Sequence, residues 1–128
     1  MSDPVAAVVE ILDAQLGVPV YGASFRGEPP GALVRGSGGG SLTIGFLPSV
    51  DATVDVRVYH DSDWEASKVD RQVRNLLHNV QDVSTSHGLV RWCALSGGPN
   101  QLQESDTGWP LVLTTWQVYG DFFAIEEE

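Results

Sequence analysis

The stretch "ATVDVRVYHDSDWEASKVDRQVRNLL" (residues 52 to 77) joins a strand pattern directly to a helix pattern. In its first part, Val54, Val56 and Val58 alternate with polar positions, which is typical of a strand with one buried face. Further on, apolar residues recur three and four positions apart, which predicts an amphipathic helix with a stripe of Ala66, Val69, Val73, Leu76, Leu77 and Val80. The predicted solvated face of that helix carries Lys68, Asp70, Arg71 and Arg74.

Between the strand and the helix lie one histidine and three carboxylates: His60, Asp61, Asp63 and Glu65. Such a group can bind a divalent cation. A calcium loop, however, also needs a turn glycine and a distal glutamate, and here the helix has already begun. A helix cap explains the pattern better, because Ser62 as N-cap with Glu65 three residues later forms a capping box, and the carboxylates complement the helix dipole. We therefore predict a structural cap at Ser62 and Glu65 and no metal site.

The composition narrows the class of protein. The chain has 128 residues, 42% of them hydrophobic, one cysteine and a formal net charge of −10. This is enough for one domain with its own core. We expect no signal peptide and no membrane span, since no apolar run approaches the ~20 residues that crossing a bilayer requires. The excess of acidic residues disfavours direct binding to nucleic acid or to an anionic membrane.

The remaining segments predict an α+β domain. A first helix is expected from its N-cap Asp3 and Pro4 to a stop at Gly17, followed by a short extended piece at 18–22. Further strands are expected at 32–35, 41–47, 88–96 and 110–125. Flexible loops are expected near 24–31, 36–40 and 97–109, with an acidic tail at 126–128. Together these predict a single domain over 1–128, a mostly antiparallel twisted sheet with two helices packed on one face.

The sequence gives no positive support for catalysis. The glycine stretch at 35–41 lacks the lysine of a phosphate-binding loop and leads into a strand rather than a helix. Cys93 lies in the middle of a predicted strand, where a cysteine is usually a small buried hydrophobe. General acid–base work by Asp55 or Glu65 has nothing else in its favour. We therefore predict no enzyme, no catalytic residues, no metal and no cofactor.

Aromatic residues concentrate in the last third of the chain, on or beside the final two predicted strands. On the last strand both faces carry apolar side chains, with Leu111 and Leu113 on one face and Trp116 and Val118 on the other. Two helices can cover only one face of a small sheet. We therefore expect the other face to meet another chain, which indicates a role in assembly.

In the pattern and order of its elements, nearly the whole chain resembles the tail-terminator, or tail-completion, proteins of long-tailed bacteriophages. The resemblance rests on the N-terminal helix leading to "VPVYG" (18–22) and on "SLTIGFLP" (41–48). It also rests on the strand-to-helix passage at 54–79 and on the closing "TGWPLVLTTWQVYGDF" (107–122).

This resemblance implies a structural virion protein of the tail and neck region, assembled in the host cytoplasm as a homohexameric ring. Such a ring caps the tail tube, ends tube growth and presents a surface to the head-completion proteins of the neck, while DNA passes through its channel without specific binding. Six copies would carry a charge of about −60, which would keep DNA from adhering. The candidates for contacts between subunits or rings are Gly36, Ser37, Gly38, Gly39, Gly40, Gln101, Glu104, Asp106 and Trp109.

Two other classes of protein stay open at this point. Another neck or tail-tube component of a virion would share the size, acidity and α+β content of this chain. A small-ligand-binding or enzymatic α+β domain would instead show an enclosed apolar pocket with converging polar groups.

Overall fold

The structure is a computed structural model that describes residues 4–22, 29–36, 42–43 and 49–121. The predicted cap Asp3, most of the 24–31 loop, residues 37–40 and the tail at 126–128 lie outside the described residues. The elements of the described chain, in order, are α1 (Pro4–Gln15), β1 (Val20–Gly22), β2 (Gly31–Gly36), β3 (Leu42–Thr43), β4 (Ser49–Tyr59), α2 (Asp63–His78), β5 (Val83–Thr85), β6 (Gly88–Gln103) and β7 (Pro110–Asp121).

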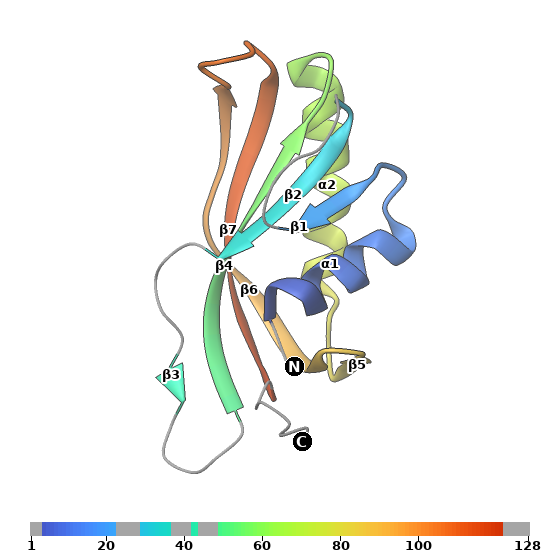
Figure 1. Cartoon of the computed structure of the whole chain (residues 1–128), viewed down its shortest axis with the longest axis vertical. Coiled ribbons are helices and arrows are strands. Elements are labelled where there is room, and N and C mark those ends of the chain that lie inside the picture. Colours follow the sequence, from blue (N-terminus) through green and yellow to red (C-terminus); the bar gives the residue numbers. More distant parts are fainter. Residues whose placement is uncertain (1–3, 23–28, 37–41, 44–48, 122–128) are drawn as a thin grey trace.

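The strands of the described residues form one sheet, which twists along its length (Figure 1). The strand order is β1-β2-β4-β7-β6-β5, and β3 pairs with β4 off this path. Only β1 and β2 run parallel, and every other pair of neighbours is antiparallel. At its centre, β4 and β7 pair without interruption from Ser49 opposite Asp121 to Tyr59 opposite Leu111. This regular register fixes which side chains point to each face of the sheet.

Both helices lie on the same face of the sheet (Figure 1). The helix α1 buries Ala7, Val8 and Leu12 against it. The predicted stripe is buried at Ala66, Val69, Val73 and Leu77 of α2 and at Val80, which lies just beyond the end of that helix, with Leu76 partly buried against the same core. The strands contribute Ala32, Val34, Ala52, Val54, Val56, Val58, Val90, Cys93, Trp116 and Val118. The predicted α+β class, the mostly antiparallel sheet and the packing of two helices on it are therefore confirmed.

The predicted loop at 97–109 is wrong, because β6 continues to Gln103 and only residues 104–109 connect it to β7. Beyond a region of register shifts between Val90 and Asn100, residues 100–103 pair with 110–113. The sequence does not predict that β6 continues to Gln103, because Gly97, Gly98 and Pro99 break the strand pattern. Gly98 has a φ of +84°, and a Cβ there would lie 2.5 Å from the Leu113 carbonyl oxygen, so only glycine fits. Residues 97–99 form an irregularity within β6, and regular pairing with β7 begins again at Asn100.

Leu12 tests the packing of α1, because its side chain is 0% exposed between that helix and the sheet. We expect Leu12→Ala to lower the free energy of unfolding by about 2–5 kcal/mol through the cavity that it leaves. Leu102→Ala is the matched control: Leu102 is 47% exposed, so the loss should stay within about 0.5 kcal/mol. Urea denaturation followed by circular dichroism measures both losses. Equal losses would contradict the packing of α1 on the core.

Candidate interaction surfaces

The face of the sheet opposite the helices, called the open face from here on, has two apolar ends. At one end Leu33, Tyr59 and Leu111 form a small buried cluster, and Tyr21, Trp109 and Leu113 pack against it. At the other end the ring of Trp92 stacks on Tyr119, with ring centroids 5.4 Å apart and an interplanar angle of 17°. Trp92 keeps 42% of its surface exposed. The open face thus presents an exposed aromatic side chain, as the apolar pattern on both faces of the sequence predicts.

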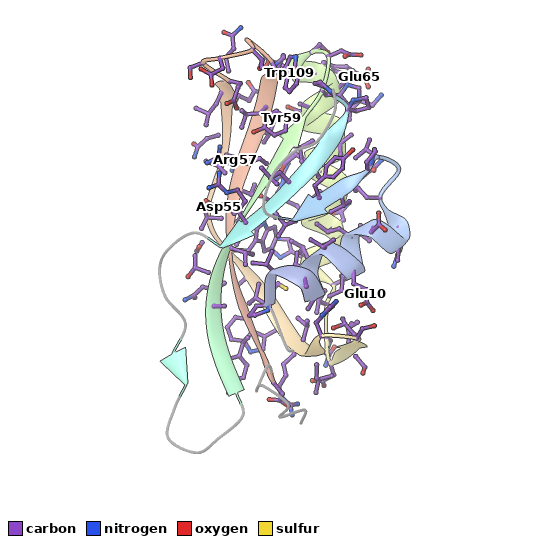
Figure 2. The ribbon with its side chains drawn as sticks, in the orientation of Figure 1. Glu10, Asp55, Arg57, Tyr59, Glu65 and Trp109 are labelled. Atoms are coloured by element: carbon purple, nitrogen blue, oxygen red, sulfur yellow. The ribbon has the colours of Figure 1, made fainter. Side chains whose placement is uncertain are left out.

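A polar band crosses the middle of the open face between these two ends. Asp55 and Arg57 project from β4, and the Thr115 hydroxyl of β7 donates to Asp55 Oδ1 at 2.9 Å (Figure 2). Within the described part of the chain, the buried Arg57 Nε has no hydrogen-bond partner. A buried donor without an acceptor costs free energy.

The turn of the β6–β7 hairpin is tied to the open face by Tyr59. Its hydroxyl donates to Glu104 Oε1 at 3.2 Å, and its ring meets the Trp109 ring edge-on, with centroids 6.1 Å apart (Figure 2). Burial raises the pKa of the Tyr59 hydroxyl above its ordinary value, Arg57 opposes this shift and Glu104 adds to it. The turn closes through the Glu104 amide, which donates to the Trp109 carbonyl at 2.9 Å. Glu104 and Trp109 therefore stabilise their own subunit.

The structure does not bring the predicted contact residues together. Of the hairpin residues, Asp106 is exposed in the turn, while Glu104 and Trp109 are half-buried. Gln101 points toward the helices, where its Nε2 donates to Ser67 Oγ of α2 at 2.8 Å. Gly36 is exposed at the end of β2, and residues 37–40 lie outside the described residues. Contacts of these residues with other subunits stay predictions.

The turn into α2 has the geometry of a helix cap. Ser62 is the N-cap, and its Oγ accepts a hydrogen bond from the Glu65 amide at 3.3 Å. Asp63 and Glu65 lie in the first turn, where the helix dipole favours negative charge. His60, which the sequence leaves without a role, accepts the Asp61 amide at Nδ1 at 2.8 Å. Among the described residues, no group of three or more His, Cys, Asp or Glu side chains is placed to hold a metal ion.

Asp70 does not lie on the solvated face of α2, as its sequence position had indicated. It is only 1% exposed; its Oδ2 accepts from Arg74 Nε at 2.9 Å, and its buried Oδ1 has no hydrogen-bond partner in the described part of the chain. Burial raises the pKa of Asp70, and Arg74 opposes the rise. The signal for its burial is helical spacing, because position 70 is four residues after Ala66 and three before Val73.

The buried Cys93 is not a reactive thiol, and it does not line the groove between the two helices. The Cys93 side chain is 8% exposed, and burial raises the pKa of its thiol to about 12, so that it stays protonated at neutral pH. A groove of about 470 Å³ lies between α1, α2 and β5. Its carboxylate, Glu10, accepts the Ser86 amide at 3.1 Å and 3.3 Å, which ties α1 to the β5–β6 turn.

No helix in the described ranges is both long and apolar enough to span a membrane.

Comparison with known proteins gives a match in fold only. No protein-family model matches the chain, and no curated protein matches it. Among solved structures, the chain is similar to one described as "Virion of native gene transfer agent (GTA) particle". The TM-score is 0.67 at 16% sequence identity, and the match covers 91% of this chain and 92% of that chain. The two chains therefore share one fold over nearly their whole lengths.

Ser62→Ala tests the cap. Removal of the hydroxyl leaves the Glu65 amide without its acceptor, and we expect the free energy of unfolding to fall by about 1 kcal/mol. Ser105→Ala, at an exposed position of the hairpin turn, is the matched control and should change stability by less than about 0.5 kcal/mol. Thermal and urea denaturation measure both variants. An unchanged stability in Ser62→Ala would argue against a capping role.

Asp70→Asn tests how the buried carboxyl group affects the pH dependence of the free energy of unfolding. Because the pKa of Asp70 is raised in the folded protein, the native state keeps this proton at pH values where the unfolded chain has lost it. The stability that this group contributes is therefore greatest below its ordinary pKa of 3.8 and is lost as the pH rises through the folded-state pKa. The free energy of unfolding of the wild type minus that of the variant should fall with rising pH. A difference that rises would be inconsistent with the burial of Asp70.

Proposed function

We propose that this protein is a structural virion subunit that forms a ring at the end of a tail tube. In this proposal the ring, built from six copies, stops growth of the tube and provides the surface that the head-completion proteins of the neck bind. DNA passes through the channel without specific binding. The protein acts by shape and contact and carries out no chemical reaction.

The observation that carries the proposal is the fold shared with a chain of a virion, which extends over 91% of this chain and 92% of that one. It agrees with the resemblance to tail terminators, which rests on the order of elements in the sequence. Shared fold alone does not fix function. The surface of this chain supplies the second argument, because the exposed Trp92 on the open face is suited to burial against another protein.

We propose two kinds of contact for the ring. The open face, with the exposed Trp92 at one end, offers a surface for a neighbouring subunit. The β6–β7 hairpin extends from one end of the sheet, beside the start of α2 (Figure 1). We assign the open face to contacts within the ring and the hairpin to contacts with the next ring or the neck.

The charge of the chain suits this role. Each copy carries a formal net charge of −10. A closed ring of such subunits repels a phosphate backbone, so that DNA can move through it without adhering. The same charge disfavours a role in which the protein holds DNA.

The proposal is tested by adding the purified protein to tail-tube protein of the same particle while the tubes polymerise. Tube length and the appearance of tube ends are measured by electron microscopy. We expect tubes to become shorter as the protein is added and to end in a six-fold ring. Tubes of unchanged length with bare ends would contradict the proposal, and binding to a neck protein without any effect on tubes would favour another neck component.

Two charge substitutions refine this test. Trp92→Glu places a carboxylate on the open face and should abolish ring formation and tube capping. Gln72→Glu adds the same charge at an exposed position of α2 and should leave both unchanged. Capping by Trp92→Glu at the wild-type level would show that the open face is not the contact between subunits.

A further inference from the structure

The outer edge of β6 is free over most of its length. In the described residues β5 pairs only with 88–90, so no strand covers the edge over residues 92–103. Irregular pairing and Pro99 interrupt this edge up to Asn100, and such features protect a strand edge from pairing with other chains. Beyond that point the strand Asn100–Gln103 is regular and carries no charge. This short segment therefore lacks the usual protection.

Exposed apolar side chains flank the same segment. Among the described residues, three large hydrophobic side chains are exposed, and two of them, Trp64 at 67% and Leu102 at 47%, belong to this end of the molecule. A cleft of about 370 Å³ lies between the first turn of α2 and the end of the β6–β7 hairpin, and it is lined by Asp63, Gln101, Leu102, Gln103 and Pro110. The exposed Leu102 gives an apolar side chain of an added strand a place to pack.

The charge at this end is strongly negative. In residues 61–68 and 100–110, the only basic residue is Lys68, whose Nζ lies 3.7 Å from the Glu65 carboxylate. Against it stand the carboxylates of Asp61, Asp63, Glu65, Glu104 and Asp106. The start of α2 and the hairpin lie side by side at this end, where Figure 2 labels Glu65 and Trp109. A segment that binds here gains most from positive charge.

We propose that this end of the molecule binds an extended, basic segment of another protein. The segment adds a strand to the free edge at Asn100–Gln103, one of its apolar side chains packs on the exposed Leu102, and its Lys or Arg side chains face the surrounding carboxylates. Backbone hydrogen bonds supply the pairing, and the apolar contact and the charges supply selectivity.

A second copy of this chain does not meet these requirements. Among the described strands, β2, β4 and β6 have one basic residue each, Arg35, Arg57 and Arg91, and the other strands have none. Arg91 is already paired with Asp82 and Asp121, at 3.2 Å and 3.0 Å. The partner is therefore a different and basic protein.

This inference is independent of the ring proposal, since a single copy carries the whole surface. The test uses the full chain labelled with nitrogen-15 and a synthetic peptide of about seven residues in which Lys and Val alternate, the length of a short strand. Two control peptides match it: one has Glu in place of Lys, and the other has alternate backbone nitrogens methylated, which blocks strand pairing without changing charge or side chains.

Nuclear magnetic resonance titration locates and measures the binding. We expect saturable shifts in the amides of Asn100–Gln103 and in the Trp64 indole, with affinity that falls as salt is added. The methylated peptide and the Leu102→Ala variant should each bind about tenfold more weakly, and the Glu peptide should not bind. The proposal is overturned by an absence of shifts at Asn100–Gln103, by equal binding of a control peptide, by shifts centred on Trp92, or by self-association through this edge.

Discussion

The indole of Trp116 lies at the centre of the core, and the fold depends on how it is held. Its Nε1 donates to Thr114 Oγ1 at 2.9 Å, and the Thr114 hydroxyl in turn lies 3.5 Å from the Val56 carbonyl. From the other side His78 of α2 meets the ring edge-on, with centroids 5.2 Å apart. Strand β7, strand β4 and helix α2 thus meet at one fully buried side chain, with its polar atom satisfied.

Both helices pack on one face of the sheet, so neither of them covers the open face. The chain has no third helix in its described residues to cover the open face, so the side chains there pack on one another at one end and leave Trp92 exposed at the other. The long β6–β7 hairpin likewise extends past the point where β5 covers β6. We propose that other chains cover the open face and the free edge.

The sequence predicts the covered side of this fold well, because burial there leaves a periodic signal. Val54, Val56 and Val58 alternate in the strand, and the helical stripe from Ala66 to Val80 is buried as its spacing predicts. Features that depend on long-range pairing leave no such signal. The extension of β6 beyond Gly98 follows from hydrogen bonding to β7, and the contact of the exposed Gln101 with Ser67 follows from the position of the hairpin beside α2. Asp70 is buried although its residue type favours the solvated face.

Hydroxyl-radical footprinting of the tryptophans tests most directly the claim that these surfaces serve assembly. Oxidation is measured by mass spectrometry in the free protein and in the protein mixed with the tail-tube protein of the proposed assembly. Trp64 and Trp92, which are 67% and 42% exposed, should react readily in the free chain and become several-fold less reactive in the assembly. Trp116, which is fully buried, should react little in both states. Unchanged oxidation of Trp64 and Trp92 in the assembly would contradict the account.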